Sequence, residues 1–116
     1  MYNFLMNILQ EFDTIAAIAT PIGTGGVGVI RISGEKSFEI IDKIYSKHNL
    51  KEGKISHGLI KDGDKIIDEV IVLPFKNPKS YTGEDIIEIH CHGGINVVRN
   101  ILDVVLKNGA RTAERG

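Results

Sequence analysis

The segment Ser80–Gly94, which reads SYTGEDIIEIHCHGG, constrains the fold more than any other part of this chain. Its centre predicts a strand, in which successive side chains point to opposite faces of a sheet. One face is apolar and consists of Ile87, Ile89 and Cys91. The other face carries Ile86, a carboxylate and imidazoles, namely Glu88, His90 and His92. Because a glycine pair then opens a helix, we expect these polar groups to meet a polar ligand at the end of the strand.

Hydrophobic periodicity predicts helices and strands of ordinary length over the rest of the chain. Strands are expected at Thr14–Thr20, Val27–Ser33, Ile55–Ile60 and Lys65–Phe75, and helices between Ser33 and Tyr45 and at Ile95–Asn108. Asp62-Gly63 is a strong hairpin signal. The order strand, strand, helix, three strands, helix predicts an α+β domain with helices packed on a mixed or mainly antiparallel sheet.

Local signals predict where these elements begin and which faces they bury. Ser33 is expected to cap the first helix, with Glu35 in its first turn. The apolar stripe of that helix is Phe38, Ile40, Ile41, Ile44 and Tyr45, and that of the second is Ile95, Val98, Ile101, Leu102, Val105 and Leu106. Val70–Leu73 is apolar without alternation, which is typical of a strand covered on both faces.

Arg31 and Glu88 are opposite charges in the middle of apolar strands. Charged groups are rarely buried alone, so each needs an opposite charge, a ligand or solvent. One interpretation is a structural ion pair. The other is recognition of a flat heterocycle, because carboxylate oxygens match a ring edge that offers an amino group beside a ring N–H, as pterins and guanines do. The arginine would then hold a carbonyl or carboxylate of the same ligand.

Three other features of the sequence could be functional, but a structural interpretation is favoured for each. The glycine-rich Gly23–Gly28 leads into a strand and not a helix, which favours a tight connection over a phosphate loop. His90 and His92 could hold a metal with Glu88, but a zinc site normally takes three or four ligands, so we expect His92 to bond the Gly93-Gly94 turn and His90 to line a pocket. A core-facing free cysteine behaves as a small hydrophobe.

The composition excludes several classes of protein. The 116 residues carry 14 basic and 15 acidic side chains, a net charge of −1, which argues against a module that binds nucleic acid through a broad basic face. No apolar run is long enough to span a membrane. A single cysteine rules out an internal disulfide and suits the reducing cytoplasm.

Three segments together carry a resemblance to a known family. They are DTIAAIATPIGTGGVGVIRISG (Asp13–Gly34), Ser80–Gly94, and GARTAERG (Gly109–Gly116). They resemble the N-terminal domain of the tRNA-modification GTPase MnmE, also called TrmE. The match covers the chain from Asp13 to its end, and residues 1–12 are expected to be an extension.

The resemblance implies a fold, a ligand and an assembly. The N-terminal domain of this family is a β2-α-β3-α unit that binds 5-formyl-tetrahydrofolate, a one-carbon donor, and forms a homodimer with the folate near the shared interface. The family's folate-contacting arginine and glutamate lie in motifs that match GVGVIRIS and GEDIIEIH. The resemblance therefore implies that Arg31 and Glu88 bind the folate, and it implies no catalytic or metal-binding residue in this chain.

The full-length family protein hydrolyses GTP with Mg²⁺ and K⁺. With the FAD-carrying partner MnmG, or GidA, it modifies C5 of the wobble uridine in certain tRNAs. We expect residues 13–116 to be a fragment that lacks the GTPase domain and a later lysine that helps to bind folate, and to be non-catalytic alone. One alternative is a dimerisation scaffold whose folate affinity is lost through truncation. Another is an independent metal-dependent enzyme built on His90 and His92.

Overall fold

The computed structural model describes residues 14–19, 26–76 and 84–113 of the chain. In chain order its elements are β1 (Ile15–Ile18), β2 (Val27–Ser33), α2 (Ser37–Ile44), β3 (Ser56–Asp62), β4 (Lys65–Phe75), β5 (Ile86–His92), α3 (Ile95–Lys107) and β6 (Arg111–Thr112). The predicted order of elements is confirmed, with β6 as an addition. The extension at residues 1–12, residues 23–25 of the glycine-rich segment and the turn at 80–83 lie outside the described residues.

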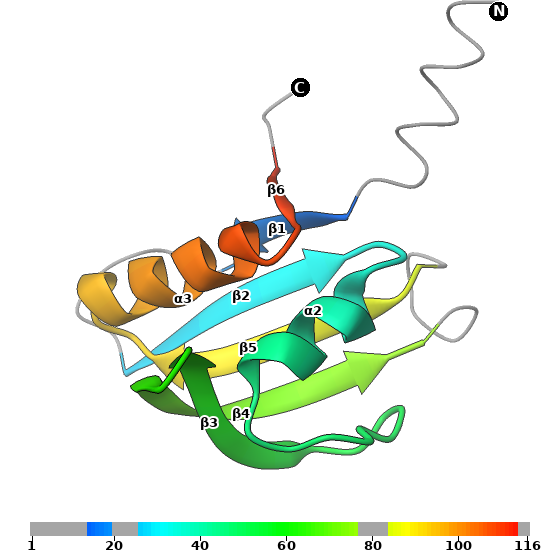
Figure 1. The fold of residues 1–116 in the computed structure, drawn as a ribbon, viewed down its shortest axis with the longest axis horizontal. Coiled ribbons are helices and arrows are strands. Elements are labelled where there is room, and N and C mark those ends of the chain that lie inside the picture. Colours follow the sequence, from blue (N-terminus) through cyan, green and yellow to red (C-terminus); the bar gives the residue numbers. More distant parts are fainter. Residues whose placement is uncertain (1–13, 20–25, 77–83, 114–116) are drawn as a thin grey trace, which may run out of the picture.

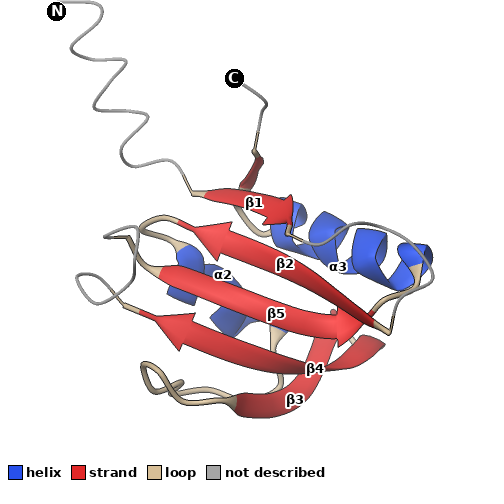
Figure 2. Cartoon of the chain, turned by 180° about the vertical axis from the view of Figure 1, so that it is seen from behind, coloured by secondary structure: helices blue, strands red, loops and turns tan. Residues whose placement is uncertain are grey.

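All the strands belong to one six-stranded sheet in the order β3-β4-β5-β2-β1-β6. Neighbouring strands are antiparallel except β1 and β6, which are parallel. The predicted α+β fold with a mixed, mainly antiparallel sheet is therefore confirmed. Both α2 and α3 lie on one face of the sheet (Figure 1). Figure 2 shows the opposite face, which we call the open face and which carries Arg31 of β2, Glu88 of β5 and Ile71 of β4.

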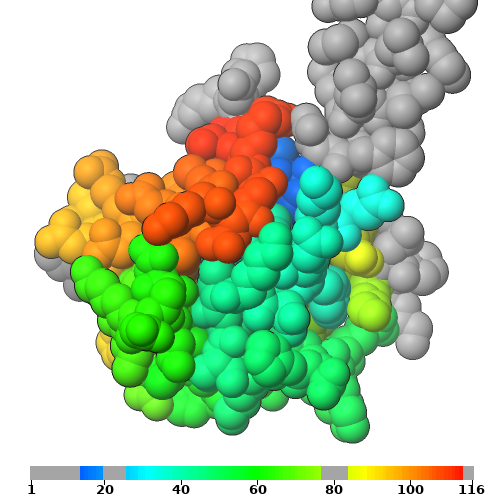
Figure 3. Space-filling model, viewed as in Figure 1, coloured from blue at the N-terminus to red at the C-terminus, as the bar shows by residue number. Residues whose placement is uncertain are grey.

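The core lies between the sheet and the helices, because the alternating strands turn their branched residues to that side. Its centre consists of fully buried side chains from both layers, including Ile30, Ile32, Ile40, Val70, Val72, Ile87, Ile89 and Ile101. The side chains of α2 and α3 pack next to each other over this face of the sheet (Figure 3). Within the described part of the chain, neither helix has the length and apolar character needed to cross a bilayer.

The first helix begins later than the sequence predicts. Ser33 is paired on both sides as the last residue of β2, so its backbone is extended and it cannot cap the helix. The helix starts at Ser37, whose hydroxyl donates to the carbonyl of Gly34 at 2.7 Å. The acidic residue in the first turn is Glu39, not Glu35. The predicted cap is therefore wrong, because sheet pairing extends β2 through the residue that the local signal assigned to the helix.

The second helix starts at the predicted residue and ends at Lys107, one residue before the predicted end, but it does not bury the whole predicted face. Its buried residues are Val98, Ile101, Val104 and Val105, while Leu102 and Leu106 are partly buried against the core. Ile95 is 42% exposed, so its predicted burial is wrong. Periodicity identifies the centre of the stripe, but the docking of α3 on the sheet decides which residues at its margins are covered.

The hairpin between β3 and β4 is confirmed, with its turn one residue further along than Asp62-Gly63. Asp62 pairs with Lys65, so the two-residue turn is Gly63-Asp64. Gly63 has a φ of 61°, the positive value that tight hairpin turns require and that glycine adopts without steric cost.

The prediction that Val70–Leu73 is covered on both faces is wrong. Val70 and Val72 are buried under the helices, whereas Ile71 is 40% exposed and Leu73 is half-buried. The described helices cover only one face of the sheet, so the other residues of this apolar run lie on the open face. Four neighbouring apolar residues hide this alternation in the sequence.

Candidate ligand-binding site

Arg31 and Glu88 lie directly opposite each other on neighbouring strands of the open face. The antiparallel register of β2 and β5 pairs them. The guanidinium donates twice to the same carboxylate oxygen, Oε2 of Glu88, from Nε at 3.0 Å and from Nη2 at 2.6 Å. The structure therefore brings together the two site residues predicted from the sequence, 57 positions apart in the chain.

Glu88 is an ionised acceptor in a partly desolvated position. Its side chain is 15% exposed, against 37% for Arg31. The other carboxylate oxygen, Oε1, lies 3.2 Å from Nε2 of His90, which donates because the carboxylate can only accept. Burial raises the pKa of Glu88, but hydrogen bonds from Arg31 and His90, together with their charges, hold that pKa below its usual value. The carboxylate of Glu88 is therefore ionised at neutral pH and faces the open side of the sheet.

The lowered pKa of Glu88 predicts an acid-sensitive contribution to stability. Because the pKa is lower in the folded chain than its ordinary value of 4.5, this contribution is complete above that ordinary value and is lost as the pH falls through the folded one. The Glu88→Gln substitution removes the titration. The free energy of unfolding of the wild-type chain should therefore fall more steeply between about pH 5 and pH 3 than that of the variant. Urea titrations across this range measure the difference, and parallel curves would contradict it.

A cavity of about 350 Å³ lies on the open face next to the pair and is linked to it through His90, which contacts Glu88. It is lined by apolar and imidazole side chains that include Val27, His57, Ile71, His90 and His92, and by the carboxylate of Glu69. His57 is opposite Ile71, which is opposite His90, so one row of side chains crosses β3, β4 and β5. The sequence analysis missed Ile71, because its apolar run shows no alternation, and left His57 unplaced. An apolar cavity beside a few fixed polar groups is typical of a small-molecule site.

His92 has a different partner from the one predicted. Its Nδ1 lies 2.8 Å and 3.0 Å from the carboxylate oxygens of Asp68, which also accept from the backbone N–H of His92 at 2.9 Å. The imidazole is therefore tied to the start of β4 and not to the glycine turn. His90 and His92 engage different carboxylates, and across residues 14–19, 26–76 and 84–113 no group of three His, Cys, Asp or Glu side chains could hold a metal ion.

Cys91 and Gly28 have structural positions beneath the site. Cys91 is 5% exposed, and burial raises the pKa of its thiol to about 11, so it is a poor nucleophile at neutral pH. A Cβ atom on Gly28 would lie 2.6 Å from Cγ2 of Val98 and 3.3 Å from Sγ of Cys91. Gly28 therefore allows α3 to approach β2 closely. For this one residue of the glycine-rich segment, a structural role agrees with the sequence analysis.

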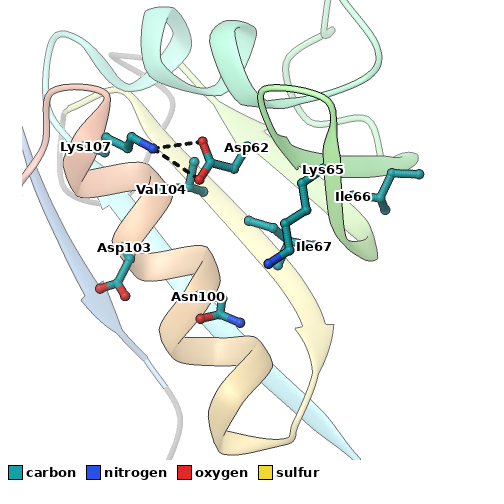
Figure 4. A pocket seen from close by; sticks show the side chains of 8 residues that line it. All are labelled: Asp62, Lys65, Ile66, Ile67, Asn100, Asp103, Val104 and Lys107. Atoms are coloured by element: carbon teal, nitrogen blue, oxygen red, sulfur yellow. Dashed lines mark hydrogen bonds and ion pairs between the residues drawn. The ribbon is translucent and has the colours of Figure 1, made fainter.

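A second cavity, of about 270 Å³, lies between α3 and the β3–β4 hairpin (Figure 4). Lys107 donates there to both carboxylate oxygens of Asp62, at 3.0 Å and 3.2 Å, and Lys65 lies on the same wall as Ile66 and Ile67. None of the sequence-predicted site residues lines this cavity. It lies on the helix side of the fold, away from the open face.

Comparison with known proteins matches almost all of the chain. The family model described as GTP-binding protein TrmE N-terminus matches residues 14–116. A tRNA modification GTPase MnmE from Caldicellulosiruptor saccharolyticus is 51% identical over 113 residues, covering 92% of this chain and 25% of the relative. Those from Pseudothermotoga lettingae and Streptococcus mutans are 53% and 49% identical, covering 90% and 94% of this chain and 24% and 25% of the relatives. The chain thus spans about a quarter of the length of these relatives.

Proposed function

The chain belongs to the family of the GTP-binding protein TrmE N-terminus, and we propose that it is the folate-binding and dimerisation domain of a tRNA modification GTPase. Its ligand is 5-formyl-tetrahydrofolate, the one-carbon donor. Arg31 and Glu88 bind that ligand. The domain acts in the cytoplasm, where a lone cysteine stays reduced.

The observation that carries this proposal is the charge state and orientation of Glu88. Its carboxylate is ionised and partly desolvated, and Arg31 donates twice to the same oxygen. Among the described residues, the other oxygen has one contact, to His90 at 3.2 Å. Carboxylate oxygens have more than one lone pair each, so this group can still accept from the amino group and the adjacent ring N–H of a pterin edge.

The surroundings of the pair also fit a flat ring. Leu73 lies opposite Glu88 on β4, and Val29 and Ile71 flank His90 in the next row of the sheet. The half-buried Leu73 and the 40% exposed Ile71 offer apolar surface to the ring, while Arg31 keeps its charge toward a carbonyl or carboxylate of the same ligand. A bound folate would supply a one-carbon unit, and the residues described here would bind and orient it.

The open face also supports the dimerisation part of the proposal. Val27 and Ile71 are 59% and 40% exposed there, beside half-buried Leu59, Leu73 and Phe75. Exposed apolar surface of this kind marks an interaction site. The competing function is a scaffold that dimerises through this face without binding folate, which the same apolar residues support.

In the full-length protein we propose that this domain works together with a GTPase domain that uses GTP, Mg²⁺ and K⁺. The proposed partners are an FAD-carrying protein of the MnmG, or GidA, type and the tRNA whose wobble uridine is modified at C5. The relatives' name, tRNA modification GTPase MnmE, supports this assignment.

Calorimetric titration of the chain with 5-formyl-tetrahydrofolate tests the proposal, with the mass in solution measured on the same sample. We expect a dimer that binds the folate saturably, because both charged residues and the apolar surface are already in place. A dimer without binding would support the scaffold function. A monomer without binding would contradict both parts of the proposal.

A further inference from the structure

The loop between α2 and β3, residues 46–55, is joined to the end of β4, the strand next to β5. The backbone N–H of Gly53 donates to the carbonyl of Pro74 at 2.8 Å, which ties this loop to β4. The preceding residue of β4, Leu73, lies directly opposite Glu88. Neighbouring strands are about 4.8 Å apart, so this tie lies only one strand away from the strand of Glu88. Figure 2 shows the loop next to the end of β4, on the side away from β5.

Three lysines of this region line a cavity of about 460 Å³. They are Lys47, Lys51 and Lys54, all exposed, and Ser56 and His57 form part of the same wall. Two lysines elsewhere form ion pairs, since Lys43 lies 3.7 Å from Glu39 and Lys107 lies 3.0 Å from Asp62. Within the described residues, the three lysines of the loop have no carboxylate within ion-pair distance.

This lysine cavity shares one lining residue, His57, with the cavity on the open face. His57 lies in one row of that face with Ile71 and His90, and His90 contacts Glu88. The row therefore leads from the neighbour of Glu88 past the apolar Ile71 to His57 and the lysines. A ligand that fits it has a flat hydrogen-bonding ring at one end, an extended middle and several carboxylates at the other end.

We propose that Lys47, Lys51 and Lys54 bind the carboxylates of a γ-linked polyglutamate tail on the folate. This inference rests on the proposed folate function, because the ring of the ligand must sit at Glu88. Each lysine would form an exposed ion pair with one carboxylate of the polyglutamate tail. Such pairs are individually weak and sensitive to salt, and they add up when several lie along one ligand.

Calorimetric titration with the monoglutamate and triglutamate forms of 5-formyl-tetrahydrofolate tests this inference. The triglutamate should bind about tenfold more tightly at low salt, because two or three exposed ion pairs contribute roughly two- to fivefold each. The advantage should shrink as the salt concentration rises. The triple variant Lys47→Ala, Lys51→Ala, Lys54→Ala should abolish the advantage and change monoglutamate affinity by less than about threefold.

Lys65→Ala is the matched control, because Lys65 lines the separate cavity on the helix side (Figure 4) and should leave the triglutamate advantage unchanged. If the wild-type chain binds neither form, the proposed folate function itself fails. If it binds both forms equally, or if the triple variant keeps the advantage, the folate function stands and the tail site is wrong. If the triple variant binds each folate form as tightly as the wild-type chain does but loses binding to tRNA, the lysines contact RNA and the tail site is wrong.

Discussion

Glu88→Gln should weaken binding of 5-formyl-tetrahydrofolate by about 2–4 kcal/mol, roughly 30- to 1000-fold. The substitution keeps the shape of the side chain but replaces an acceptor-only carboxylate by an amide with its own N–H donors. That amide NH2 either faces the donors of the pterin edge or takes the place of the oxygen that Arg31 holds at 2.6 Å, and in each case two donors face each other. Removing one partner of a charged hydrogen bond leaves the other partner uncompensated, which accounts for the size of the loss. Calorimetric titration measures it.

Glu39→Gln provides the matched control for this experiment. Glu39 lies on α2, on the helix side of the sheet, and its carboxylate lies 3.7 Å from the ammonium group of Lys43. Its side chain is 62% exposed and lies away from the open face, so this substitution should change the affinity by less than about threefold. An unchanged affinity in Glu88→Gln would exclude the proposed role of Glu88.

Arg31→Ala separates the two interpretations of the charged pair. Under the folate proposal the variant stays folded and binds the ligand more weakly. If it unfolds in the absence of ligand, the pair is a structural ion pair. Urea unfolding of the ligand-free variant distinguishes these outcomes before any titration is made.

Gly28→Ala should destabilise the fold by about 2 kcal/mol, within the range that overpacking of a tight core costs. The new Cβ would lie 2.6 Å from Cγ2 of Val98, a β-branched residue of α3 that is 2% exposed. Branched side chains have few rotamers in a helix, so Val98 cannot turn away and α3 must shift instead. Urea unfolding measures the loss.

Two further variants make this prediction specific to the contact between β2 and α3. Gly26→Ala, in the same glycine-rich segment, adds a Cβ that meets nothing within 4 Å and should change the stability by less than about 0.5 kcal/mol. Val98→Ala should be less harmful in the Gly28→Ala background than in the wild-type chain, because it removes the clashing methyl groups. Equal costs in the two backgrounds would show that the clash is not the cause.

Local sequence patterns predicted most of the elements correctly, because they depend on neighbours along the chain. Alternation in Val27–Ser33 and Ile86–His92 placed each side chain on the correct face, including the two charges. The Gly63 hairpin and the end of α3 followed from local backbone preferences in the same way. The errors lie at Ser33, at Ile95, at His92 and in Val70–Leu73, where contacts with distant segments override the local pattern.

The sequence by itself singled out the two charged residues of the proposed site, because a charge in the middle of an apolar strand stands out without any knowledge of its neighbours. Only the tertiary structure decided that β5 lies between β4 and β2, which sets Arg31 opposite Glu88 across 57 positions. It also decided that the helices cover one face only, leaving Ile71 open beside the pair. Strand order and register depend on pairing between segments far apart in the chain, and the alternation of a single strand carries no information about its partner.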